Sequence, residues 1–200
     1  MAKFLGFSPT QQTVVTKIYR DCRVILENAH AKAGTEGWRN VFTQIMGSAS
    51  GPALKSAEQA LEETIKVMFM RIGGQSFDVT YEATFTNTNA DMLSVGHAVS
   101  GGGASHTTFV DEARQQGAVS SRLPMRLGPN FFAMDDRNLF EQSKVETFLH
   151  ELSHHSVGSI DDSNGGECYG WTGVTRLKGL GPARAVWNAE NIGFFLTWLG

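Results

Sequence analysis

The sequence predicts an α+β fold in a single domain, mostly helical with a small antiparallel sheet. The chain has 200 residues, which is a usual size for one domain. Apolar residues recur at helical spacing in residues 1–73, alternate with polar residues over short stretches in 76–127, and return to helical spacing in 140–200. Helices, then a small sheet, then helices is an order typical of the α+β class.

Three helices are expected in the first part of the chain. Residues 8–11, Ser-Pro-Thr-Gln, form a capping box with proline at the first helical position, and a long helix over 9–33 follows. A short helix is expected over 38–45. A third helix over 53–70 should stop at the pair Gly73–Gly74, because glycine favours the end of a helix.

The middle part has strand character, and the last part is helical. Residues 77–85 alternate and are rich in β-branched side chains, which is typical of a strand. Weaker strands are expected over 92–99, 106–110 and 125–127. Two helices are expected in the last part, over 145–155 and over 181–199, where Gly-Pro opens the second one.

The composition excludes several classes of protein. Hydrophobic residues make up 41% of the chain and charged residues 18%, which is too apolar for intrinsic disorder. A net charge of −3 argues against a nucleic-acid-binding surface. No apolar run reaches the roughly 18 residues that a membrane span needs. Cys22 and Cys168 could be free thiols or a disulfide, because their distance cannot be read from the sequence.

Residues 150–154, His-Glu-Leu-Ser-His, lie inside the expected helix over 145–155. Residues four positions apart on an α-helix differ by about 6 Å of rise and about 40° of rotation, so His150 and His154 can reach one point. Histidines in this arrangement bind Zn²⁺. Glu151 would lie beside the metal, well placed to take a proton from water. The motif therefore predicts a zinc site with Glu151 as general base.

A catalytic zinc site needs a third protein ligand and an open fourth position. No histidine follows His155, so the third ligand is expected to be acidic. The chain can turn at Gly158 and return to the metal soon after the motif. The acidic candidates after the motif are Asp161, Asp162, Glu167 and Glu190, and weaker candidates before it are Asp135 and Asp136.

The residues after the motif extend the pattern. Gly-Ser-Ile-Asp follows at 158–161, and Tyr-Gly follows at 169–170. This order resembles the aspzincin, or deuterolysin-type, metallopeptidases, in which H-E-x-x-H precedes G-T-x-D-x-x-Y-G. The resemblance covers about residues 124–195. It implies a zincin-like fold, a Zn²⁺ cofactor and hydrolysis of peptide bonds.

The resemblance also assigns roles to the matching residues. It implies that His150, His154 and Asp161 are the zinc ligands. It also implies that Glu151 is the general base and that Tyr169 stabilises the oxyanion. The chain differs from the family's pattern in two ways: Ser159 stands where threonine is usual, and the aspartate and tyrosine lie further apart. Asp162 is therefore kept as a second candidate for the third ligand.

Glu190 lies on an apolar stripe of the expected last helix, where a carboxylate is costly unless it is paired. In lysine-specific members of the family, the matching acid lines a pocket and binds the substrate lysine, so we expect Glu190 to contact substrate. These members have a second acid three residues later, where this chain has Gly193. Glu190 could instead orient a histidine ligand, or form a salt bridge with Arg184 or Arg176.

The sequence thus predicts a zinc-dependent endopeptidase that acts on a protein or peptide. One alternative is a secreted toxin or effector hydrolase with a narrow or non-protein substrate, such as a cell-wall peptide, and with an inhibitor or immunity protein as partner. Another is a non-catalytic module with a structural zinc, for which Cys168 would be the fourth ligand. Because the first residues do not resemble a secretion signal, we expect synthesis in the cytoplasm and secretion or delivery without a signal peptide.

Overall fold

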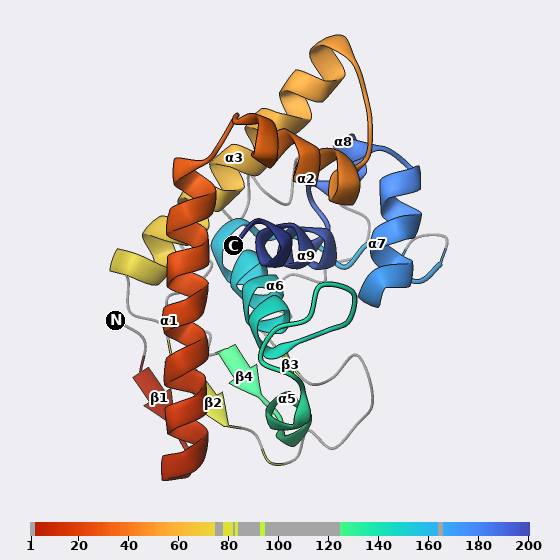
Figure 1. Cartoon of the computed structure of the whole chain (residues 1–200). Coiled ribbons are helices and arrows are strands. Elements are labelled where there is room, and N and C mark those ends of the chain that lie inside the picture. The colour runs from red at the N-terminus through yellow and green to blue at the C-terminus, as the bar shows by residue number, and fades with distance from the viewer. Residues whose placement is uncertain (1–2, 75–77, 82, 84–92, 95–124, 164–165) are drawn as a thin grey trace.

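The computed structural model describes residues 3–74, 78–81, 83, 93–94, 125–163 and 166–200 (Figure 1). The expected strand over 106–110 lies outside these residues, and so does most of the one expected over 92–99. In its described part the protein is mostly helical with a small sheet, which confirms the α+β class.

Three helices form the first part, as expected. They are α1 (Pro9–Ala31), α2 (Glu36–Met46) and α3 (Gly51–Gly74). The capping box is confirmed: the Ser8 hydroxyl accepts a hydrogen bond from the Gln11 backbone, and the Gln11 side chain accepts one from the Ser8 N–H. The apolar faces of α1 and α3 then pack against each other.

The sheet differs from the prediction in the direction of its strands. Its members are β1 (Lys3–Leu5), β2 (Asp78–Tyr81), β3 (Leu93–Ser94) and β4 (Met125–Leu127), and the spatial order is β1-β2-β4-β3. The pairs β1–β2 and β2–β4 are parallel, and the β3–β4 pair is antiparallel. The expectation of an antiparallel sheet is therefore wrong for two of these pairs.

For the β1–β2 pair the physical reason lies in β1, which was not predicted from the sequence. Parallel strands need a long crossover connection, and α1, α2 and α3 supply one between β1 and β2. A strand of three residues before a long helix gives too short a pattern to recognise.

In the described residues after β4 there are five helices. They are α5 (Pro129–Ala133), α6 (Lys144–Val157), α7 (Gly170–Gly179), α8 (Pro182–Ala185) and α9 (Ala189–Leu199). The sequence analysis anticipated α6 and missed α5 and α7. Its single helix over 181–199 is in fact α8 and α9, with a break over 186–188.

The break has a clear cause in the hydrogen bonding. Ile160, in the loop after α6, forms a parallel bridge with Asn188. The Ile160 N–H donates to the Trp187 carbonyl at 3.0 Å, and the Ala189 N–H donates to the Ile160 carbonyl at 2.9 Å. Asn188 is extended, with φ −82° and ψ 125°, and such backbone cannot continue a helix.

Figure 1 shows α6 and α9 against each other at the centre, with α1 along one side and α7 on the other. Phe148 of α6 and Phe195 of α9 are completely buried. One cluster of buried apolar side chains includes residues of α1, α2, α3, α6, α7, α8 and α9 and of β2 and β4. The helix that carries the histidines is thus enclosed by neighbours. None of the described helices is long and apolar enough to cross a membrane.

Candidate metal centre

Helix α6 positions the two histidines of the motif. It begins after Ser143, whose hydroxyl accepts a hydrogen bond from the Glu146 N–H, and it ends at Gly158 in the left-handed conformation, with φ 66°. The apolar side of the helix is buried in the core, so α6 is fixed in orientation. As a result His150 and Glu151 are almost fully buried, each with 5% of its surface exposed.

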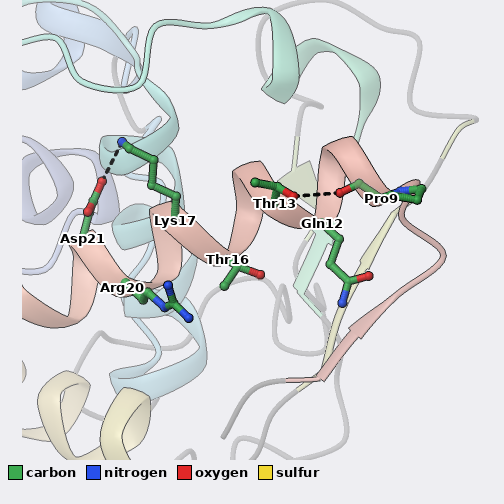
Figure 2. A pocket seen from close by; sticks show the side chains of 7 residues that line it. All are labelled: Pro9, Gln12, Thr13, Thr16, Lys17, Arg20 and Asp21. Carbon is green, nitrogen blue, oxygen red and sulfur yellow. Dashed lines mark hydrogen bonds and ion pairs between the residues drawn. The ribbon is translucent and has the colours of Figure 1, made fainter.

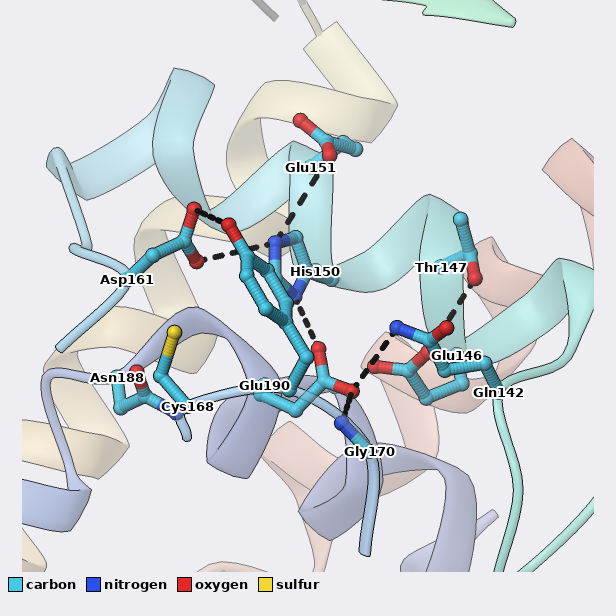
Figure 3. A network of polar contacts seen from close by, with 12 residues as sticks. Gln142, Glu146, Thr147, His150, Glu151, Asp161, Cys168, Gly170, Asn188 and Glu190 are labelled. Carbon is cyan, nitrogen blue, oxygen red and sulfur yellow. Dashed lines mark hydrogen bonds and ion pairs between the residues drawn. The ribbon is translucent and has the colours of Figure 1, made fainter. Parts of the chain in front are cut away.

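Three donor atoms converge beside α6, as Figure 3 shows in part. His150 Nε2 and His154 Nε2 lie 3.2 Å apart, and Asp161 Oδ1 lies 3.3 Å from the first and 3.5 Å from the second. Neighbouring ligands of a tetrahedral Zn²⁺ with bonds of 2.0–2.1 Å lie about 3.3 Å apart. The three atoms therefore have the mutual spacing of zinc ligands.

The hydrogen bonding of these atoms also fits a metal. Asp161 Oδ1 is buried, and no described residue gives it a hydrogen bond. The His154 Nδ1–H donates to the Ser159 carbonyl at 2.6 Å, which leaves the Nε2 lone pair available. An orphaned carboxylate oxygen beside two imidazole nitrogens is a donor set that suits Zn²⁺.

The structure separates the acidic candidates for the third ligand. Asp161 faces the histidines, whereas Asp162 binds Arg184 through both carboxylate oxygens. Glu167 accepts hydrogen bonds from the N–H groups of residues 168 and 169. Asp136, before the helix, pairs with Lys17 and Lys144. Of the two alternatives that the sequence left open, the geometry thus favours Asp161.

Glu190 lies behind His150, and its side chain has no exposed surface. Its Oε2 is 2.8 Å from His150 Nδ1, and its Oε1 accepts hydrogen bonds from the Gly170 N–H at 2.6 Å and the Gln142 amide at 3.2 Å (Figure 3). This burial does not fit the expected contact with substrate. It fits the alternative in which Glu190 orients a histidine ligand.

The suggested salt bridge of Glu190 with Arg184 or Arg176 is not found. Arg184 binds Asp162, and Arg176 donates to the Glu167 carbonyl. Glu190 is therefore buried beside His150 and not paired with either arginine.

The sequence analysis missed Glu146, one helical turn before His150. Glu146 is fully buried, and one of its carboxylate oxygens lies within 4.8 Å of His150 and Glu190 donor atoms. A Cβ at Gly193 would lie 2.5 Å from Glu146 Oε1, so the carboxylate of Glu146 requires a glycine there. The one signal in the sequence was an acid four positions before a histidine on the same helix.

The charges of the site shift the pKa values of its members. Burial raises the pKa of Glu151 to about 7. Burial lowers the pKa of His150, but Asp161 and Glu190 outweigh it, so the pKa of His150 is raised well above its usual value. Burial raises the pKa of Asp161, but His150 and His154 outweigh it and hold that pKa far below its usual range. The site therefore attracts positive charge.

Tyr169 covers the site from the end of the loop before α7. Its hydroxyl donates to Asp161 Oδ2 at 3.0 Å, and its ring stacks on His150 with the centroids 6.2 Å apart. Burial and the charge of Asp161 raise the pKa of Tyr169, so the hydroxyl stays protonated.

The structure also describes the two cysteines and one hollow on the surface. Cys22 and Cys168 are both free and buried, so the disulfide alternative is not realised. A shallow hollow of about 690 Å³ runs along α1 (Figure 2). Its lining comes from α1 alone and contains no residue of the predicted site.

A comparison with models of known protein families gave no match, and a comparison with curated proteins gave none either. The geometry of the site is therefore the basis for its chemistry.

Proposed function

We propose that this protein is a zinc-dependent endopeptidase of the aspzincin type, in which His150, His154 and Asp161 hold Zn²⁺. The observation that supports it most is the 3.2–3.5 Å spacing of their three donor atoms. When bound, zinc supplies a Lewis acid that polarises a carbonyl group and makes water more acidic. Three protein ligands leave one position for substrate or water, as in catalytic rather than structural sites.

Glu151 is the general base of the proposed reaction. Its Oε1 lies 3.8 Å from His150 Nε2, and its donor atom lies within 4.8 Å of those of both histidines, so the carboxylate is beside the proposed zinc position. Glu151 accepts a proton from the attacking water and returns it to the amine that leaves. A pKa that burial raises to about 7 suits a group that must do both near neutral pH.

Tyr169 is the second residue that acts on the reacting atoms. Its protonated hydroxyl is held at Asp161 and can turn to donate to the carbonyl oxygen as negative charge develops there. Preorganised donors of this kind stabilise the transition state more than the bound substrate.

The structural-zinc alternative requires Cys168 as a thiolate. Burial raises the pKa of Cys168 to about 12, which disfavours the thiolate. Unless a metal binds it, Cys168 thus stays a neutral thiol, and a Cys168→Ser variant that keeps its zinc would favour an open site over a closed one.

Elemental analysis and cleavage of an unfolded protein, measured together, test the proposal. Wild type should hold one zinc per chain and cleave, and Asp161→Ala should lose both. Glu167→Ala is the matched control and should keep both, because Glu167 faces the backbone of its own loop. Wild type without zinc would contradict the proposal. Zinc without cleavage would favour the hydrolase with a narrow substrate.

A further inference from the structure

Asp162 and Arg184 form a bidentate ion pair next to Asp161. Arg184 Nη2 lies 2.7 Å from Oδ1 and 2.6 Å from Oδ2 of Asp162, and Nε lies 2.9 Å from Oδ2. Asp162 is nearly buried, with 8% of its surface exposed. Bidentate pairs of arginine and carboxylate fix geometry better than single contacts do. The pair therefore joins the loop after α6 to the short helix α8.

The backbone on both sides of Asp161 is fixed to the same region. Ile160 pairs with the segment 187–189, and the Asp162 N–H donates to Asn188 Oδ1 at 2.9 Å. The Asn188 amide in turn donates to Asn191 Oδ1 at 2.9 Å. Asn188 and Asn191 are fully buried, so these bonds are shielded from water.

Asn191 extends the connection into the core. Its amide donates to the carbonyls of Ile45 in α2, at 2.9 Å, and Val174 in α7, at 3.3 Å. The loop that holds Asp161 is thus attached to α2, α7, α8 and α9. The break between α8 and α9 contributes to this arrangement, because it leaves backbone groups free to form hydrogen bonds with Ile160.

The direction of Asp161 follows from its neighbours. The Ser163 N–H donates to the Asp161 carbonyl at 2.9 Å, so the chain turns at Asp162. Arg184 binds the Asp162 side chain, whereas the Asp161 carboxylate reaches His150 and His154. Without the ion pair, Arg184 would no longer hold the Asp162 side chain away from the histidines, whereas the Tyr169 hydroxyl and the backbone contacts of the loop would remain.

We infer that Asp162 and Arg184 are positioning residues that orient Asp161 for metal binding and so determine the affinity of the site for zinc. This inference rests on the proposed function. The pair does not touch the metal, and its effect is on how well the third ligand is preorganised. Partners that orient metal ligands in this way contribute roughly 10- to 100-fold to metal affinity.

Zinc dissociation constants, measured by competition with a chromophoric chelator, test the inference. Arg184→Met and Asp162→Asn should each bind zinc roughly 10- to 100-fold more weakly than wild type. The double variant should bind zinc about as weakly as the single variant with the lower zinc affinity, because both substitutions break the same ion pair. Arg184→Lys should be intermediate, since lysine cannot make the bidentate contact.

A second measurement separates positioning from stability. The urea midpoint of each variant without metal gives the cost to the fold. Lys17→Met, which removes an exposed salt bridge to Asp136 elsewhere, is the control and should leave zinc affinity unchanged. Loss of zinc affinity beyond what the lower midpoint explains supports the inference. If the loss of zinc affinity in each variant is fully explained by its lower urea midpoint, the inference is wrong.

Asp161→Ala distinguishes failure of the inference from failure of the proposed function. If Asp161→Ala loses zinc affinity while Arg184→Met and Asp162→Asn keep it, the inference is wrong and the metal site stands. If Asp161→Ala binds zinc as tightly as wild type, the third ligand has been misassigned and both are wrong.

Discussion

Glu190 is a buried carboxylate with three partners, namely His150 Nδ1, the Gly170 N–H and the Gln142 amide. A charge without exposed surface is costly unless it is paired in this way. The contact with Nδ1 orients the imidazole so that Nε2 faces Asp161. Glu190 should therefore influence the metal through His150 and not through substrate.

Replacing Glu190 by glutamine should weaken zinc binding roughly 10- to 100-fold, because the neutral amide no longer orients and polarises His150. Chelator competition gives the dissociation constant. Gln142→Ala is the matched control: it removes another contact of the same carboxylate without touching His150, and it should bind zinc nearly as wild type does. Equal losses in both variants would contradict a specific action through His150.

Replacing Glu151 by glutamine should lower peptidase activity by roughly 10²- to 10⁴-fold, the usual contribution of a general base. The zinc content should not change, because Glu151 is not among the three converging ligands. Activity on an unfolded protein and elemental analysis measure the two effects. The exposed Glu141, changed to glutamine in the same way, should show neither. Wild-type activity in Glu151→Gln would exclude Glu151 as the base.

The sequence predicted the motif residues of the site better than those outside the motif. His150, Glu151 and His154 could be placed because helical periodicity alone brings the two histidines to one point. The choice between Asp161 and Asp162 could not be made, since it depends on pairing with a segment 26 residues further on. The burial of Glu190 also required the packing of α9 on α6.

At the scale of the elements, Asp136, in the loop between α5 and α6, connects α1 to α6. Its carboxylate lies 3.0 Å from Lys17 of α1 and 3.0 Å from Lys144 of α6. Hydrogen bonds from Lys17 and then Lys144 lower the pKa of Asp136. A carboxylate with a lowered pKa stabilises the fold above its ordinary pKa of about 3.9 and loses this contribution as the pH falls through the folded value.

The stability advantage of wild type over Asp136→Asn should therefore shrink as the pH falls from about 5 to about 3. The advantage at pH 5 should be below about 1 kcal/mol, because half of the Asp136 side chain is exposed and water screens the pairs. Urea unfolding at a series of pH values measures it. An advantage that stays constant over this range would show that Asp136 contributes no charge interaction.

The helices that the sequence analysis missed or merged share one physical cause. Residues 181–199 are apolar enough for one long helix, but the bridge between Ile160 and Asn188 interrupts it. Short α7 is rich in glycine and buries few apolar residues, among them Val174 and Leu177. Local periodicity predicts a helix whose ends depend on the local sequence alone. It does not predict a helix whose ends depend on tertiary hydrogen bonds.

For the whole molecule, the class was predictable and the topology was not. The change from helical to alternating patterns gave the α+β class, but the direction of β1 relative to β2 depends on the crossover formed by α1, α2 and α3. The prediction of a single domain has a physical basis in the cluster of buried side chains that joins both helical parts to the sheet. Phe195 lies inside this cluster, with its ring centroid 5.3 Å from that of Trp38.

If the chain is one cooperative domain, Phe195→Ala should lower the free energy of unfolding by about 3–5 kcal/mol and shift the whole transition. Urea unfolding followed by tryptophan fluorescence and by circular dichroism should give coincident curves before and after the substitution, because α2, α6 and α9 share this core. Leu180→Ala, at a side chain that is 52% exposed, should change stability by less than about 0.5 kcal/mol. Two separate transitions, with only one moved by Phe195→Ala, would mean that the sheet and the helices unfold as independent units.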